Sequence, residues 1–440
     1  MSFKSIAGSP LWRLWSVVIA GEAIFVLPFV LPRLFRPVML AQWGISNTEL
    51  GLAFSAYGIV AAMAYFAGGP LADRFGPRVM MTLALLSTAA CGLALWGQPS
   101  ATRLLWTYAA FGITTILLFW APMIRATHDL ARTQTQGRAF GILDAGRGLF
   151  AALLASLLSF VFASLVDDGG EADAFEAILL LAILSVAASG ALVWLGLNQP
   201  TTARCETTNF GQNAATPGHS INVQAIGRVL RRRSVWLQGW IVLCAYCGYK
   251  SIDNYGIYVV DAYDASSSRA AWVTTLAFWA RPIAALSAGL VADRAGRMGW
   301  LAVLFAVVAM GNGWLAIDHR PTNGPVAVTL SATPVLLTLL GCTAAAIYGL
   351  RGVYFAVFDD LRIPPTLVGT AAGLVSLVGF LPDIFFGPVT GWVIDQYPGI
   401  TGHRMVFAGI AVMSVMGVAA SLWQRRDVRQ ATNSLDQTSA

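Results

Sequence analysis

Residues 69–78 read GPLADRFGPR and follow a long apolar run. A similar stretch, GLVADRAGR, occupies residues 289–297 at the end of another apolar run and begins 220 positions later, half a chain away. An acid, an arginine and glycines repeated at one spacing indicate that the chain consists of two similar halves. The sequence therefore predicts a duplication at the scale of a domain.

The composition is that of a membrane protein. Of the 440 residues, 57% are hydrophobic and 11% are charged, and the mean hydropathy is +0.66. The apolar residues gather in runs of about 18–25, the length that crosses a hydrocarbon core of about 30 Å. Each run must be helical, because lipid offers the backbone no other hydrogen-bond partner. Twelve runs are predicted, at about 11–32, 48–72, 79–97, 103–124, 139–165, 174–197, 235–260, 270–292, 299–317, 334–358, 367–394 and 405–423.

These runs predict an all-α membrane protein with twelve transmembrane helices in two pseudo-symmetric six-helix bundles. The longest polar stretch divides them into an N-terminal bundle (1–197), a cytoplasmic linker (198–234), a C-terminal bundle (235–424) and a disordered cytoplasmic tail (425–440). The linker ends in the basic segment VLRRR, which we expect to form a short amphipathic helix on the membrane surface.

Charge and cysteine patterns bound the environment. The 28 Lys and Arg residues concentrate in loops on the side of the N-terminus, so the positive-inside rule places both termini in the cytoplasm. We expect a multi-pass monomer in the lipid bilayer of a bacterial inner membrane, without nucleic-acid partners. The five cysteines are scattered, mostly in apolar runs, so we expect no disulfide framework, no metal and no cofactor.

The G-x-x-x-D-R-x-G-x-R pattern between the second and third runs resembles the signature loop of the major facilitator superfamily. Its second copy lies between the eighth and ninth runs, where the repeat of that family falls. The resemblance covers almost the whole chain and implies a secondary transporter, but it does not name a substrate.

The resemblance also implies that each loop is a cytoplasmic gate. Its carboxylate would meet the N-terminus of a neighbouring helix, and its arginines would pair with acids such as Asp129, Asp359 or Asp360. The alternative is that these charges only anchor the loops. The predicted gate residues are Gly69, Asp73, Arg74, Gly76, Arg78, Gly289, Asp293, Arg294, Gly296 and Arg297.

Eight ionisable residues lie inside the predicted spans, where each needs a partner or a purpose. Two pairs are three residues apart on one helical face, Asp144 with Arg147 and Lys250 with Asp253. For them, an ion pair within the helix and contact with a substrate are equally supported. The others are Glu22, Arg281, Arg351 and Asp383.

Arg281 lies halfway along the eighth run, among aromatic residues and before Pro282. A guanidinium at this depth suits bidentate recognition of a carboxylate, sulfonate or phosphate. Oxalate/formate-type and nitrate/nitrite-type carriers of the superfamily are similar in using an arginine here. The chain departs from them at Ala61, where the nitrate type has an arginine, and at Asp383, where the oxalate type has a lysine. The alternative role of Arg281 is a structural pair with Glu22 or Asp383.

Two sets of candidate residues result. Deep tyrosines in the seventh run favour a cavity lining, which gives a predicted substrate-binding set of Arg281, Arg147, Lys250, Arg351, Tyr246 and Tyr249. A carboxylate buried without a fixed partner suits proton exchange near neutral pH, which gives a predicted proton-coupling set of Glu22, Asp383 and Asp144. For the carboxylates, the alternative is a static bridge to Arg281 or Arg351.

The sequence thus predicts a secondary active transporter that moves a small solute, an organic anion, by alternating access, with proton coupling or exchange. Neutral sugars or the efflux of amphipathic drugs are the alternative cargoes. An enzyme is not expected, because the loops are too short to build a catalytic constellation and the sequence has no ATP-binding loop.

Overall fold

The computed structural model describes residues 10–130, 136–197, 227, 229–317, 332–361, 363 and 365–438. All secondary-structure elements within these ranges are helices. Most of the predicted linker lies outside them. In the first half the elements are α2 (Pro10–Ala23), η1 (Val26–Val30), α3 (Leu31–Trp43), α4 (Asn47–Phe75), α5 (Pro77–Gly92), η2 (Leu93–Leu95), α6 (Ala101–Gly112), η3 (Ile113–Trp120), α7 (Ala121–Leu130) and α8 (Gln136–Gly196).

The described elements of the second half are also helices. Its elements are α10 (Arg233–Ser251), η4 (Ile252–Asn254), α11 (Tyr255–Tyr263), α12 (Ser267–Ala295), α13 (Arg297–Ile317), α14 (Ala332–Val353), η5 (Ala356–Asp359), α15 (Pro365–Gly379), α16 (Pro382–Gln396) and α17 (Ile400–Thr438).

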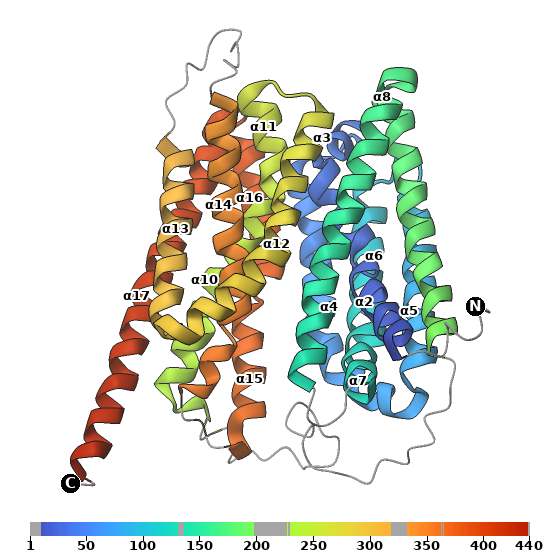
Figure 1. The fold of residues 1–440 in the computed structure, drawn as a ribbon. Coiled ribbons are helices and arrows are strands. Elements are labelled where there is room, and N and C mark those ends of the chain that lie inside the picture. The colour runs from blue at the N-terminus through green and yellow to red at the C-terminus, as the bar shows by residue number, and fades with distance from the viewer. Residues whose placement is uncertain are drawn as a thin grey trace. The chain divides into compact units, whose positions relative to one another are not determined.

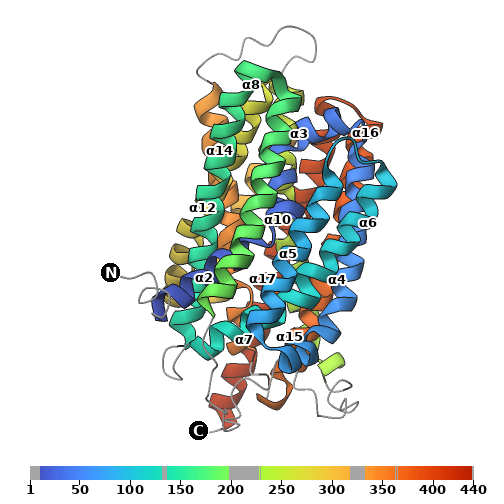
Figure 2. The same cartoon turned by 90° about the vertical axis from the view of Figure 1, so that its right-hand side faces the viewer.

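The helices confirm the predicted fold class. In the described part of the chain, ten helices are long and apolar enough to cross a membrane, or eleven if the two parts of α12 form one span. The seventh predicted run is covered by α10 and α11, which the short η4 interrupts. The helix α8 contains two spans, which run antiparallel on either side of a turn (Figures 1 and 2). The turn falls at Gly170, whose positive φ of 86° is open to glycine at little cost.

One stretch differs from its prediction. The helix α17 continues to Thr438, so residues 425–438 are helical rather than disordered. The first part of this segment, residues 425–430, contains three arginines and one glutamine, which favour a helix.

The repeated motif ends one helix and begins the next in both halves. Gly76 separates α4 from α5 with φ +74°, and Gly296 separates α12 from α13 with φ +85°. A residue with a side chain adopts such an angle only with strain. The second glycine of the motif is therefore explained by backbone geometry.

The chain divides into two compact units that do not coincide with the sequence halves. The first contains residues 1–208, 253–282 and 383–396, and the second contains residues 209–252, 283–382 and 397–440. In the first unit, α2 and α5 pack against α8, and α4 packs against α6. In the second unit, α13 packs against α14 and α17, and α10 packs against α15 and α17.

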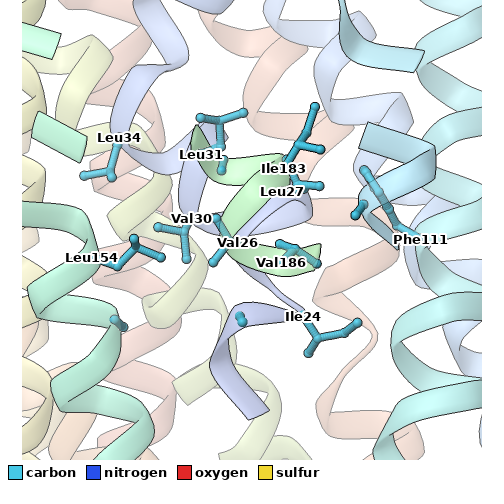
Figure 3. Close-up of a cluster of buried hydrophobic side chains, with 14 of the residues drawn as sticks. Ile24, Val26, Leu27, Val30, Leu31, Leu34, Phe111, Leu154, Ile183 and Val186 are labelled. Carbon is cyan, nitrogen blue, oxygen red and sulfur yellow. The ribbon is translucent and has the colours of Figure 1, made fainter. Parts of the chain in front are cut away.

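The core of the first unit surrounds the π-helical η1. Its Val26, Leu27 and Val30 are buried and gather with Ile183 and Val186 of α8, as Figure 3 shows. This packing holds η1, which begins four residues after Glu22.

Candidate functional site

Three charged side chains from three helices meet inside the first unit. Glu22 of α2 is only 6% exposed. Arg281 of α12 donates from Nη1 to Oε1 of Glu22 at 2.8 Å, and Nε of Arg147 in α8 lies 3.2 Å from Oε2 of Glu22. One carboxylate thus occupies two guanidiniums at once, and we call Glu22, Arg147 and Arg281 the Glu22 cluster.

Asp144 stands at the edge of this cluster. Its side chain is 60% exposed, and its Oδ1 lies 3.8 Å from Nη2 of Arg281. The sequence spacing suggested a pair between Asp144 and Arg147, but the described ion pairs join Asp144 to Arg281 and Arg147 to Glu22.

Aromatic rings cover the guanidinium of Arg147. Its Cζ lies 5.7 Å from the ring centroids of both Phe25 and Trp120, within range of cation–π attraction. Phe25 directly precedes η1, and Trp120 ends η3. These are the two π-helical segments that the described residues form, and π-helical turns are frequent at functional sites.

Two glycines make room for the arginines. A Cβ atom on Gly21 would lie 2.9 Å from Sδ of Met123 and 3.1 Å from Cδ of Arg147. A Cβ atom on Gly148 would lie 3.3 Å from Cγ of Arg281. Each glycine is the sequence neighbour of a charged residue in the cluster, and this adjacency is a signal that the sequence analysis did not use. The sequence analysis also did not name Phe25 and Trp120 as site residues.

A second group of charged residues ties α3 to the segment after α10. Arg33 donates from Nε to Oδ1 of Asp253 at 2.5 Å, and their side chains are 3% and 13% exposed. Arg36 donates to the side chain of Asn254 at 2.8 Å. Asp253 therefore forms an ion pair with Arg33, and the pair with Lys250 that the sequence spacing suggested stays a prediction.

In the second unit, Arg351 of α14 lies among tyrosines. Its Cζ is 3.9 Å from the ring centroid of Tyr249 and 5.8 Å from that of Tyr246. Tyr249 in turn contacts Tyr348, with ring centroids 6.0 Å apart. None of the side chains that the structure describes forms an ion pair with Arg351. Lys250 is buried in the same unit.

Asp383, the other candidate for proton coupling, lies near the start of α16. Its backbone packs closely on α4, since a Cβ atom on Gly58 would lie 2.7 Å from the Asp383 carbonyl oxygen.

The arginines of the first gate motif have aromatic neighbours. Arg78 stacks on Trp194 at 3.8 Å and donates to the Trp194 carbonyl at 2.9 Å. Arg74 lies 5.4 Å from the ring of Phe75. Asp129, their expected partner, lies 3.8 Å from Arg125. Gly69 lies in α4, and the side chain of Asp73 lies outside the described residues.

The second gate motif forms one of the expected pairs. Nη1 of Arg297 lies 3.4 Å from Oδ1 of Asp360 and donates to the Ala356 carbonyl at 3.0 Å. Its Nε lies 3.7 Å from Asp293. Gly289 and Arg294 lie in α12, and Arg294 is exposed. The side chain of Asp359 lies outside the described residues.

Within the described ranges, no cluster of His, Cys, Asp and Glu side chains is suited to hold a metal ion. Cys244 and Cys247 are buried in α10 as free thiols.

Comparison with known proteins gives a consistent result. Residues 16–381 match the family model of the Major Facilitator Superfamily. The inner membrane protein YqcE of Escherichia coli K12 is 26% identical over 401 residues, which is 90% of each chain. The glycerol-3-phosphate transporter of Bacillus subtilis is 21% identical over 84% of this chain and 83% of its own.

Solved structures show the same fold. The nucleoside transporter NupG superposes with a TM-score of 0.71 at 14% identity, over 94% of this chain and 98% of its own. A bacterial homologue of the human lysosomal transporter Spinster, in an inward-facing and unoccupied conformation, also gives 0.71 at 16% identity, over 96% of this chain and 99% of its own.

Proposed function

The chain belongs to the major facilitator superfamily, and from this premise we propose that it is a secondary transporter that carries a small organic anion by alternating access. The Glu22 cluster is the observation that carries the choice of cargo. Its two guanidiniums already hold a carboxylate inside the membrane-spanning helices. Buried charges at such depth are costly and mark substrate or ion pathways.

The chemistry of arginine explains the preference for an anion. A guanidinium presents its donors in a planar fork that matches the two oxygens of a carboxylate or phosphate. Arg147 and Arg281 are 12% and 15% exposed, so their charges are poorly screened by water. We propose both as substrate-binding residues.

In the second unit, we propose further substrate contacts at Arg351, Lys250, Tyr246 and Tyr249. The Arg351 guanidinium lies 3.9 Å from the ring centroid of Tyr249, and the planar fork of a guanidinium suits the oxygens of an anion. The phenol groups suit the hydroxyls of a hydroxylated acid.

The names of the relatives are compatible with this choice. The glycerol-3-phosphate transporter and the hexuronate transporter of Bacillus subtilis, each 21% identical, are named for anions. The ribitol transporter of Klebsiella pneumoniae, also 21% identical, is named for a neutral polyol. A neutral polyol is therefore the second candidate, supported by the tyrosines around Arg351.

We place the protein in a bacterial inner membrane as a monomer with both termini in the cytoplasm. The basic loops on the side of the N-terminus support this orientation. Two Escherichia coli relatives are named as inner membrane proteins. Coupling to protons through Glu22, Asp144 or Asp383 belongs to the same proposal.

The test is a thermal-shift screen of the purified protein with glucuronate, glycerol 3-phosphate, ribitol and uridine. A ligand that binds only the folded state raises the melting temperature by mass action. We expect an anion to stabilise the wild type and the Arg269→Ala control, which loses an exposed arginine of the same helix α12. Arg281→Ala should lose the shift. Stabilisation of wild type and Arg281→Ala alike by ribitol or uridine, with no response to either anion, would contradict the proposal.

A further inference from the structure

We propose that the Glu22 carboxylate is an internal stand-in for the transported anion. The incoming anion displaces it from Arg147 and Arg281, and the released Glu22 takes up a proton. This inference rests on the proposed anion transport and adds the means by which anion binding is coupled to a proton.

The stand-in role follows from how Glu22 is held. Each of its two oxygens faces a different arginine, Oε1 at 2.8 Å from Arg281 and Oε2 at 3.2 Å from Arg147. The carboxylate of a free organic acid, or two oxygens of a phosphate, presents the same pair of acceptors. An anion that occupies the position of the Glu22 carboxyl group therefore meets donors that are already arranged.

Displacement changes the protonation of Glu22. The residue lies in α2 beside Gly21 and the fully buried Ala23 and Ile24, where an ionised carboxylate away from its guanidiniums is costly. The released carboxylate therefore binds one proton from water to form the neutral acid. The arginines keep one carboxylate between them, now that of the substrate, so one monoanion and one proton bind without a change in net charge.

The other charged side chains described near α2 lie in contacts of their own, so we assign this exchange to Glu22. The charged side chains described as facing it are Arg147 of α8 and Arg281 of α12, and the exposed Asp144 contacts Arg281. On the other helices packed against α2, Arg125 and Asp129 of α7 pair with each other, with His128 beside Asp129, and Arg78 of α5 stacks on Trp194. A neutral polyol offers no charge to replace Glu22 and should bind without proton uptake.

The experiment is isothermal titration of glucuronate and of glycerol 3-phosphate into the purified protein, in buffers with different ionisation enthalpies. The dependence of the measured heat on the buffer gives the number of protons taken up per anion. We expect about one proton for the wild type. In Glu22→Gln, proton uptake should vanish and the anion should bind about tenfold more tightly, since no internal carboxylate competes.

Asp173→Asn is the matched control, because it also removes one carboxylate, from an exposed position of α8 outside the Glu22 cluster. It should retain the uptake of about one proton. If an anion binds the wild type with no proton uptake, the stand-in role of Glu22 is wrong and anion transport stands. If Glu22→Gln does not fold, Asp383→Asn decides the question, because it keeps the uptake of about one proton if Glu22 is the acceptor and loses it if Asp383 is. Absence of anion binding to the wild type would overturn both proposals.

Discussion

At the scale of single residues, the main finding is which charged side chains form ion pairs with one another. Arg33 is 4% exposed and lies in α3, beyond the end that the sequence predicted for the first span. Its ion pair with Asp253 joins a residue of the first half to one of the second. Because both charges are largely buried, removing one deprives the other of a close charged partner.

We predict that Arg33→Met destabilises the protein by about 3–5 kcal/mol, the usual cost of leaving half of a buried pair. The double variant Arg33→Met/Asp253→Asn should recover part of this loss, because it also removes the orphaned charge. Thermal unfolding of the purified variants measures both effects. A double variant less stable than the single one would show that the pair is not the source of the loss.

At the scale of elements, glycines bring α4 and α16 into close contact. A Cβ atom on Gly51 would lie 2.4 Å from the Gly387 carbonyl oxygen, and one on Gly391 would lie 2.4 Å from the Asn47 carbonyl oxygen. Small residues let helix backbones approach in this way. At the N-terminus of α4, Asp395 of α16 accepts hydrogen bonds from the backbone nitrogens of Asn47 and Thr48 at 3.1 and 2.7 Å. The carboxylate suits that helix end, where unpaired N–H groups and the helix dipole favour negative charge.

Gly51→Ala should therefore separate α4 from α16 and lower stability by about 1–3 kcal/mol, the typical cost of overpacking. Its matched control is Gly313→Ala in α13, where an added Cβ meets nothing within 4 Å. That substitution should be neutral or stabilising by up to about 1 kcal/mol, as alanine favours a helix. Melting temperatures of the two variants give the comparison, and equal losses would contradict the close contact.

At the scale of the whole molecule, the distribution of charge sets the orientation in the membrane. The basic residues concentrate in the loops on the side of the N-terminus, and an even number of predicted spans returns the C-terminus to that side. The described residues contain ten or eleven candidate spans, and the side on which each terminus lies stays a prediction.

A pair of fusions tests this orientation in bacterial cells. Green fluorescent protein attached after residue 440 should fluoresce, because it folds in the cytoplasm. Alkaline phosphatase inserted near Gly170, in the turn between the two spans of α8, should be active, because that turn is predicted to face the periplasm. The reverse pattern would invert the proposed topology.

The sequence by itself determined the helical class, the duplication and the glycines that separate the helices around each motif. These features are local: lipid compels each apolar run to be a helix, and a positive φ selects glycine wherever it occurs. It also named Glu22, Arg147 and Arg281 one by one. Only the tertiary structure decided that they meet, because spacing along one helix shows which side chains share a face but not which face a neighbouring helix presents. Glu22 joins Arg147 and Arg281 because packing brings α2, α8 and α12 together, and no pattern within a single helix encodes that arrangement.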